Sequence, residues 1–540
     1  MCSNLLGFIL TKIWDGAGTA NAEPTTSVRM ANRSITDVQD ILYEVFLYLN
    51  PDHYTYQEEI ARARNTLLHS ALTCRNFARP ALDVLWNCLP SEKPLLELLW
   101  TLGIVLEVEI EGSASGPIYT YPYQGDPRAH SRWKRFQEYS MQVRSITLDP
   151  HIPRAGSIWE ILVTRLRGDS VLPALRKVTL SRESSFYRDG GASVPPLGND
   201  MTRGALWLIS PSVHQMSVSL PEPGFRIRRP AVQKIVELAC SMAPDLHYLR
   251  VRTLWPINLG FLHGHKRLHA VTIYTVTNTD ALKSLTTLPH LEDLSLAVGG
   301  TFPLRLAFQR VRFLALSGSW SRLNLFIDET DLPQLRSFSA SVIQRSRAQV
   351  WYNICASCFQ TLSRKHTRLT TLDIKCRNNV ISVGRIGLAQ ESGTSPFSLM
   401  VEPLLALHEL RDVSLLFGEF TFPFSSSDIR SFAESWPSLE SFRLEFVTQD
   451  EQRAGFESVV HFAHHCPRLR SLQLPGMELT RGSLEGIAYP EGQHHHPLRE
   501  FRVAQVAFPG GLDLSREVIQ FTQRVFPHVG APVAAVHRSL

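Results

Sequence analysis

The sequence of 540 residues has no hydrophobic run long enough to cross a membrane. The apolar stretch near its start, Leu5 to Leu10, is followed by Lys12 and falls far short of the roughly 20 apolar residues that a membrane-spanning helix needs. The stretch also lacks the basic leader that marks a secretory signal. We therefore expect a protein that is neither inserted in a membrane nor secreted.

Cysteine is scarce, with eight residues spread over the chain, most of them inside apolar runs. A secreted disulfide framework is much denser, so we expect free, buried thiols and an intracellular location, in the cytoplasm, the nucleus or both. Cys355 and Cys358 have the spacing of a metal or redox pair, but no second Cys or His pair stands in register with them. Ordinary buried thiols on an apolar helix are the favoured interpretation.

The sequence also has little excess of one charge over the other, since its formal net charge is only +5. A uniformly basic nucleic-acid binder would usually be more extreme, so we expect no nucleic-acid partner. The basic stretch from Arg128 to Phe136 includes Trp133 and Phe136, a combination that some nucleic-acid binders use. A solvated charged helix is the favoured interpretation of this stretch.

Catalytic motifs are missing as well. The sequence has no Walker-type glycine loop, paired-carboxylate motif or Gly-x-Ser-x-Gly elbow, and the stretch around Ser317 lacks the second glycine. His494 to His496 lie about 30 residues after a second histidine group, 461–465. There are two interpretations of these groups: a weak metal site, or ordinary solvated loop histidines. We predict no catalytic residue, metal or cofactor, and keep a hydrolase or transferase as the weakest alternative.

One short pattern is abundant. The order Leu-x-x-Leu-x-Leu, with other apolar residues allowed, recurs at intervals of 20 to 41 residues and is often preceded by proline. The copies begin at Val143, Leu175, Val213, Leu246, Leu268, Leu291, Val311, Leu335, Leu369, Leu410, Leu439, Leu469 and Leu498. A series of this length indicates a repeat architecture.

Each copy has the pattern of a short strand. Its last two apolar residues are two positions apart, so they share one face of a strand, and the residue between them points to the other face. The segments 232–242, 425–436 and 456–466, which lie between copies, have helical composition. Ser and Asp at the start of the second segment are available as N-caps. Strand and helix repeated about every 30 residues predict a parallel β/α solenoid.

This series resembles the leucine-rich-repeat family over roughly residues 141–505. The expected fold class is α/β, with a small all-α module followed by an irregular solenoid of parallel strands and helices. The Asn or Cys ladder position of regular repeats is mostly absent. An ordinary large α/β domain with frequent short strands is the alternative.

Residues 34–91 have a different character. Thr36 and Gln39 stand at capping-box spacing, and acidic residues fill the first turn that follows. Three apolar stripes at helical spacing follow: Ile41, Leu42, Val45, Phe46 and Leu49; Leu67, Leu68, Ala71 and Leu72; Ala81, Leu82, Leu85, Trp86 and Leu89. Three short helices make a marginal core by themselves, so we expect part of this apolar surface to be covered by a partner or by the solenoid.

The same region resembles an F-box. In that family the second helix leads into an "L-V-C-R-x-[FW]" element with a Trp about ten residues later, and this chain has Leu72, Cys74, Arg75, Phe77 and Trp86 in those places. The usual Leu-Pro opening is replaced by Ile35-Thr36, and residues 51–65 lengthen the segment between the first two helices.

The resemblance implies the substrate-recognition subunit of a Skp–cullin–F-box ubiquitin ligase. Its head would dock on a Skp-type adaptor, and through it on a cullin, while the solenoid holds an unidentified protein substrate. By analogy the adaptor contacts are Ile35, Val38, Ile41, Leu42, Val45, Phe46, Leu49, Leu72, Leu82 and Trp86. For any one of them a place in the core of the module is an equal alternative.

For the solenoid we predict that the residues between the paired apolar positions contact the substrate. They are Thr179, Arg250, Ser295, Asp373, Ser414, Arg443, Gln473 and Arg502. The loop from Ser181 to Asp200 is an insertion of the kind that often binds. Because the eight residues are polar and mixed in sign, they indicate a protein or peptide ligand.

The expected layout is a disordered tail (1–33), the head (34–91), a connector (92–140), the solenoid (141–512), and a capping helix with a tail (513–540). The main competing hypothesis is a repeat scaffold without any link to ubiquitination, in which the head only caps the first repeat.

Overall fold

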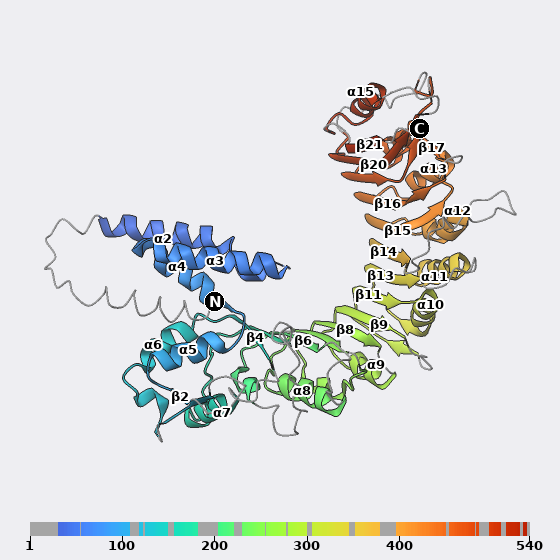
Figure 1. The fold of residues 1–540 in the computed structure, drawn as a ribbon. Helices are drawn as coiled ribbons and strands as arrows, with labels where there is room; N and C mark the ends of the chain where they lie inside the picture. The colour runs from blue at the N-terminus through green and yellow to red at the C-terminus, as the bar shows by residue number, and fades with distance from the viewer. Residues whose placement is uncertain are drawn as a thin grey trace, which may run out of the picture. The chain divides into compact units, whose positions relative to one another are not determined.

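The computed structural model describes residues 31–54, 56–108, 118–122, 125–149, 156–181, 204–220, 229–253, 255–276, 279–299, 305–344, 351–378, 396–449, 453–480, 482–484, 496–508, 515–529 and 533–536. The chain forms two compact units (Figure 1). The first comprises Met1–Trp255 with Gly264–Leu268, and the second comprises Pro256–His263 with His269–Leu540. The predicted tail, up to residue 30, and the insertion after Ser181 lie outside the described residues.

The first unit begins with the three predicted helices. They are α2 (Ala31–Leu47), α3 (Gln57–Thr73) and α4 (Arg75–Asn87), with the short turn η2 (Pro51–His53) after α2. Both α2 and α3 pack on α4, and the rings of Phe46 and Phe77 meet edge-on at 5.7 Å. The prediction that α2 is capped at Thr36 is wrong, because its helical backbone starts at Ala31. No glycine or proline interrupts residues 31–35, so nothing stops the helix from extending there.

The head runs directly into the sheet. Helix α4 ends at Asn87, and the next two residues form β1 (Cys88–Leu89), which pairs in parallel with β4 (Ser145–Leu148). An ion pair of 3.2 Å between Asp52 and Lys177 adds a second link between the head and the strands. The sheet therefore begins within the residues that the sequence assigned to the head, rather than near residue 141.

Residues 92–140, expected to be a connector, contain regular elements. These are α5 (Lys93–Thr101), the antiparallel pair β2 (Leu106–Val108) and β3 (Ile118–Thr120), η3 (Pro127–Ala129) and α6 (Trp133–Ser140). Trp133 and Phe136 are buried, and the ring of Tyr139 lies 5.0 Å from that of Trp86. Because its two aromatic residues are buried, the basic stretch does not present them for stacking on bases.

Every predicted repeat strand is present. In the first unit β4 is followed by α7 (Gly156–Arg165), β5 (Lys177–Ser181), η5 (Ala205–Leu208), β6 (Gln215–Leu220), α8 (Arg229–Ser241) and β7 (Tyr248–Thr253). The strands from β4 to β7 pair in parallel with their neighbours.

The second unit continues the alternation of strand and helix. Its strands are β8 (Ala270–Val276), β9 (Asp293–Val298), β11 (Phe313–Gly318), β13 (Ser337–Gln344), β14 (Thr371–Asn378), β15 (Asp412–Phe422), β16 (Ser441–Thr448), β18 (Ser471–Leu474), β20 (Glu500–Ala507) and β21 (Val533–Val536). These ten strands also pair in parallel, each with the next. The chain therefore has the predicted fold, an α/β solenoid of the leucine-rich-repeat type with helices at its N-terminus.

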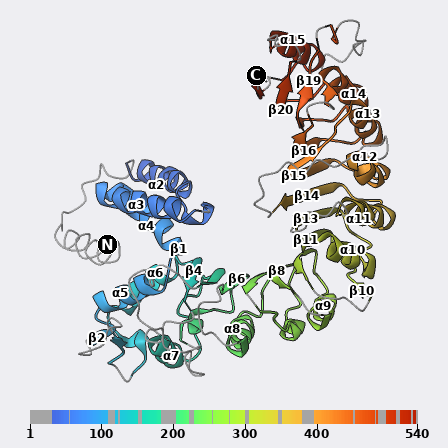
Figure 2. The same ribbon diagram turned by 45° about the vertical axis from the view of Figure 1, so that its right-hand side comes forward.

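The helices of the second unit lie along one face of its sheet. They are η6 (Gly260–Gly264), α9 (Thr279–Thr286), α10 (Trp320–Glu329), α11 (Trp351–Lys365), α12 (Pro396–Val401), η7 (Glu402–Ala406), α13 (Ser426–Ser435), η8 (Phe456–Val459), α14 (Val460–His465) and α15 (Ser515–Val525). In Figures 1 and 2, α10, α11 and α12 stack in succession beside β11 to β15, and each packs on the next. The sequence offered Ser and Asp as N-caps of α13; in the structure Ser425 is the N-cap residue, and Asp428 completes a capping box with it.

The prolines before the strands occupy a specific turn position. Pro333, Pro437 and Pro467 each stand second in a turn whose first residue accepts a hydrogen bond from the N–H of the first leucine of the repeat. The N–H of Leu335, for example, donates to the carbonyl of Leu332 at 3.2 Å. Proline is favoured at this position because its fixed φ matches the turn.

Alternate residues of each strand are buried against the helices, and aromatic side chains fill much of the second unit. The largest group, which we call the aromatic cluster, joins α12 to the strands and helix that follow it. It consists of Phe397, Phe417, Phe422, Phe424, Phe432 and Phe446. Gly418, at φ +55°, bends β15 where its register with β16 shifts, which brings further aromatic residues into the core.

The C-terminal end differs from the prediction of a closing helix. Helix α15 is present, but β21 follows it and pairs with β20. Two further short pairs lie in the second unit, β10 (Leu306–Ala307) with β12 (Thr330–Asp331) and β17 (Ala454–Gly455) with β19 (Met477–Glu478). In the described part of the chain, no helix has both the length and the apolar character that a bilayer span requires.

Two of the histidines in the second unit are buried. His496 was expected in a solvated loop, but its Nε2–H donates to the carbonyl of Cys466 at 3.1 Å, and its Nδ1 accepts from the N–H of Leu498. Burial lowers its pKa. Burial, with a smaller effect of Lys365, also lowers the pKa of His366 from 6.5 to about 4. Both imidazoles are therefore neutral in the folded protein at neutral pH.

Acid is expected to destabilise the second unit through His366. The unfolded chain binds a proton near pH 6.5, whereas the folded chain does not bind it until about pH 4. Stability is therefore lost as the pH falls through this window, by about 2 kcal/mol at pH 5. Urea midpoints at pH 7.5 and pH 5 would test this, with His366→Asn as the reference. Equal losses in the wild type and the variant would contradict the assignment.

Candidate functional site

Helix α2 presents an apolar face to solvent. Ile41 and Val45 are 63% and 53% exposed, and Tyr48, one turn further on, is exposed as well. The spacing i, i+4 puts Ile41 and Val45 on one side of α2, and Tyr48 lies in the turn directly after the last residue of the helix, Leu47. With the neighbouring residues they line a shallow hollow, formed by Asp40, Ile41, Tyr43, Glu44, Val45 and Tyr48. We call Ile41, Val45 and Tyr48 the α2 face.

Three of the ten predicted adaptor contacts lie in the core instead. Phe46 is 5% exposed and packs on Phe77, and Leu82 and Trp86 on α4 are buried too. These side chains present almost no surface to a partner, so in this structure they hold the module together. The reason is that α4, rather than α2, is the central helix on which both of the others pack.

Of the remaining predicted adaptor contacts, one is exposed and two are half-buried. Leu72 is exposed on α3, while Leu42 and Leu49 are half-buried. The side chains of Ile35 and Val38 lie outside the described residues. The sequence did not identify Tyr48, although its distance of seven residues from Ile41 would have placed it on the same helical face.

The eight predicted substrate contacts fall into line across the strands. In the first unit the register is Thr147, Thr179, Ser217, Arg250. In the second unit it runs Thr272, Ser295, Ala315, Ser339, Asp373, Ser414, Arg443, Gln473, Arg502. All of the predicted residues are half-buried or exposed, and they alternate with buried apolar residues. We call these aligned residues the strand-centre row. Its other members, which the sequence analysis did not name, occupy the same position in the remaining repeats.

The charges of this row are partly balanced within single strands. Asp373 pairs with Lys375, two residues further along β14, at 2.7 Å, and Arg443 pairs with Glu445 on β16 at 2.8 Å. Both pairs are solvent-exposed, so their contribution to stability is small. The face that results is polar and mixed in sign, which suits a protein surface better than a strongly charged polymer.

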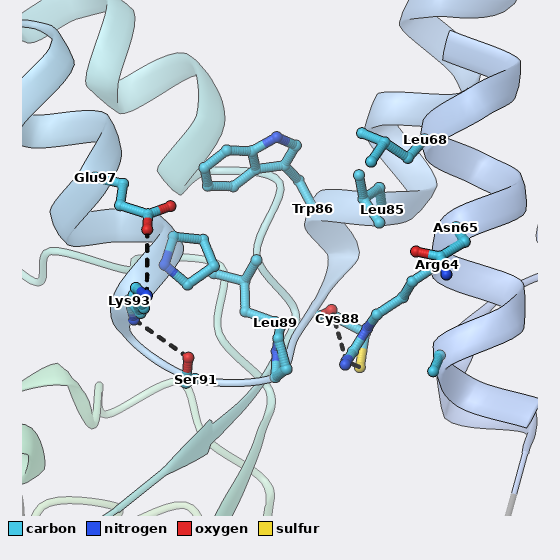
Figure 3. Close-up of a pocket in the computed structure, with 13 residues that line it drawn as sticks. Arg64, Asn65, Leu68, Leu85, Trp86, Cys88, Leu89, Ser91, Lys93 and Glu97 are labelled. Atoms are coloured by element: carbon cyan, nitrogen blue, oxygen red, sulfur yellow. Dashed lines mark hydrogen bonds and ion pairs between the residues drawn. The ribbon is translucent and has the colours of Figure 1, made fainter. Parts of the chain in front are cut away.

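The first unit also contains an apolar cavity of about 320 Å³ (Figure 3). Residues of α3, of the end of α4, of β1 and of α5 line it: Ala61, Arg64, Asn65, Leu68, Leu85, Trp86, Cys88, Leu89, Pro90, Ser91, Lys93, Pro94 and Glu97. Figure 3 shows Arg64 and Cys88 on one side and the Lys93–Glu97 pair on the other. No local pattern in the sequence indicates this cavity, because its walls come from four elements.

The polar groups of the cavity are partly engaged with each other. Nζ of Lys93 lies 3.7 Å from the carboxylate of Glu97, whose pKa is raised by burial. The thiol of Cys88 donates to the carboxylate of Asp52 at 3.0 Å. Burial, with the nearby Asp52 charge, raises the pKa of this thiol to about 11, so it is not a nucleophile at neutral pH.

The other thiols of the solenoid are equally inert. Cys355 and Cys358 lie on α11 without exposed surface, as the apolar pattern predicted. Burial raises the pKa of Cys358, Cys376 and Cys466 to about 12. Among the described residues no group of three or more His, Cys, Asp or Glu side chains is placed to hold a metal ion.

No protein-family model matches the sequence, and no curated protein matches it either. Among solved structures, a TDR receptor is 13% identical at a TM-score of 0.28, covering 72% of this chain and 60% of its own. A leucine-rich-repeat protein of Leptospira interrogans is 10% identical at a TM-score of 0.28, covering 74% of this chain and 91% of its own.

The chain thus spans about 60% of the length of the TDR receptor chain. At such low superposition scores the assignment of the fold depends on the parallel ladder and the repeats of the chain itself. The fold is that of a leucine-rich-repeat solenoid.

Proposed function

We propose that the chain is the substrate-recognition subunit of a cullin-type ubiquitin ligase inside the cell. The head would bind a Skp-type adaptor, and the strand-centre row would bind the protein to be modified. The chain would supply proximity rather than chemistry, bringing a lysine of the target close to a conjugating enzyme.

The observation that carries this proposal is the α2 face. A small helical module that leaves Ile41 and Val45 exposed on α2, and Tyr48 exposed directly after it, has apolar surface that its own core does not use. Such anchors at helical spacing are typical of helix-in-groove recognition, in which a few buried side chains supply most of the binding energy. The F-box-like residues Cys74 and Arg75 stand at the start of α4 in the same module, Cys74 as its N-cap residue and Arg75 as its first helical residue.

A second candidate is supported by the continuity of α4 and β1. Because the head leads straight into the first strand and Asp52 pairs with Lys177 on β5, the head could serve only as the N-terminal cap of a scaffold. In that case the adaptor would not bind.

Replacing Ile41 with glutamate is expected to weaken adaptor binding by at least tenfold, because a charge would be placed within an apolar contact. The measurement is calorimetric titration of a purified Skp-type adaptor into the full chain. Met141→Glu is the matched control: Met141 is 57% exposed in the same unit, outside the α2 face, and its replacement should leave the affinity unchanged.

Hydrogen exchange in β4 to β7 would confirm that both variants keep the first unit folded. The proposal fails if the wild-type chain does not bind the adaptor, or if Ile41→Glu binds it as tightly as the wild type. If the wild-type chain does not bind the adaptor but its repeats still bind partner proteins, the second candidate, a repeat scaffold capped by the head, is favoured.

A further inference from the structure

The second unit has a hollow of about 490 Å³ where three of its strands begin. Arg312, Arg336 and Arg368 line it together with Pro333 and Gln334. Arg312 and Arg336 immediately precede β11 and β13, and Arg368 precedes β14 by three residues. We call this hollow the arginine cavity.

The backbone ladder brings these arginines together. The N–H of Arg336 donates to the carbonyl of Arg312 at 2.9 Å, and the N–H of Thr370 donates to the carbonyl of Arg336 at 2.8 Å. Neighbouring strands lie about 4.8 Å apart, so residues more than twenty positions apart in sequence become direct neighbours. The guanidinium of Arg336 also donates to the carbonyl of Arg368 at 3.2 Å, which fixes its direction.

The positive charge of the cavity is largely uncompensated. Within the part of the chain that the structure describes, the guanidinium groups of Arg312 and Arg368 have no hydrogen-bonding or ion-pair partner. Besides its hydrogen bond to the carbonyl of Arg368, Arg336 has one ion-pair partner, Glu409, at 3.6 Å, and both side chains of this pair are about half exposed. Three arginines therefore line one hollow, and among the described residues the one ion-pair partner of their guanidinium groups is the solvated carboxylate of Glu409.

We propose that the arginine cavity binds a phosphate monoester carried by a partner protein. A guanidinium group presents donors in a planar fork that matches the oxygens of phosphate, and a phosphate monoester carries nearly two negative charges at neutral pH. The proposal does not depend on the head or on its adaptor.

The surroundings favour a localised anion over a nucleic-acid backbone. At the equivalent positions of the ladder, Glu292 lies next to Arg312, and Thr370, Arg411 and Glu440 follow Arg336 in that order. Arg411 is paired with Glu440 at 3.8 Å. A phosphodiester chain is usually bound by a longer run of positive charge. In this row of residues the carboxylates of Glu292 and Glu440 interrupt such a run. A protein-borne ligand is favoured because the next residue, Phe313, is 50% exposed on the strand face and could contact the flanking peptide.

The test uses the full chain and ³¹P NMR titration with an acetylated, amidated Ala-phosphoserine-Ala peptide. In the Arg312→Gln, Arg368→Gln double variant the peptide is expected to bind at least tenfold more weakly. Because neither side chain has a described partner, the melting temperature of this variant should match that of the wild type. The matched control is Arg470→Gln, Arg499→Gln, which removes the same charge from ladder positions outside the cavity and should bind as the wild type does.

Further probes decide the ligand class. A peptide with glutamate in place of phosphoserine should bind much more weakly, and inorganic phosphate should bind more weakly than the phosphopeptide. The proposal is overturned if the cavity variant binds the phosphopeptide as tightly as the wild type does, or if the glutamate peptide binds equally well. Equal affinity for inorganic phosphate would contradict a peptide-borne ligand. A ten-residue oligothymidylate is the probe for nucleic acid. If it binds more tightly than the phosphopeptide, and if both double variants weaken its binding equally, the ligand is nucleic acid instead.

Discussion

Replacing Phe397 with alanine is expected to lower the stability of the second unit by about 3 to 5 kcal/mol. Phe397 has no exposed surface and contacts the other five rings of the aromatic cluster, the nearest being Phe446 with ring centres 4.8 Å apart. Alanine would leave a cavity between α12, β15 and β16 that neighbouring strands, fixed by their ladder, cannot collapse to fill.

Hydrogen exchange resolved by segment is the suitable measurement, because a chain of two units need not unfold in one step. Protection should fall in β15, β16 and α13, and should stay unchanged in the first unit. Leu399→Ala provides the control on the same helix, since Leu399 is 44% exposed and should lose less than about 1 kcal/mol. Similar losses in the two variants would show that the cluster is not the core of this region.

The second large effect is expected at Phe46, and it contrasts with that of its neighbour Val45. Phe46→Ala should weaken the docking of α2 on α4 by about 3 to 5 kcal/mol, because the ring is 5% exposed and packs edge-on against Phe77. Val45→Ala removes a side chain that is 53% exposed and should change stability by less than about 0.5 kcal/mol. Two adjacent residues therefore have opposite roles.

Exchange protection of α2 and adaptor affinity, measured on both variants, would separate these roles. Val45→Ala should reduce the affinity while α2 stays protected, as expected for a contact residue. Phe46→Ala should reduce protection and affinity together, because the surface that binds is lost with the helix. If Val45→Ala lowered protection as much as Phe46→Ala did, the α2 face would be part of the core and the proposed adaptor site would have to be abandoned.

The solenoid could be predicted from the sequence because its signal is local and repeated. Each copy of the repeat places its buried pair two residues apart, so the strand and its inward face can be read within six residues. The same alignment identified the strand-centre row, and the Ser and Asp residues at the start of segment 425–436 indicated the beginning of α13.

The start of the sheet could not be read in this way. Strand β1 has only two residues, Cys88 and Leu89, which is too short for an alternating pattern to appear. Its pairing with β4 is a contact between residues more than fifty positions apart, and no local feature of either segment specifies it. The same holds for α6 in the connector, where Tyr139 packs on Trp86 of α4, a contact between residues more than fifty positions apart.

The sequence alone determined which strand residues alternate between the buried and the outward face, and where strands and helices repeat. It also indicated that the head carries more apolar surface than three short helices can bury. Tertiary structure decided how that surface is divided, because only the packing of α2 on α4 distinguishes Phe46 from Val45 within one wide apolar stripe. It also decided that Arg312, Arg336 and Arg368 share a cavity, since parallel strands bring the corresponding positions of successive repeats within a few ångströms of each other regardless of their separation in sequence.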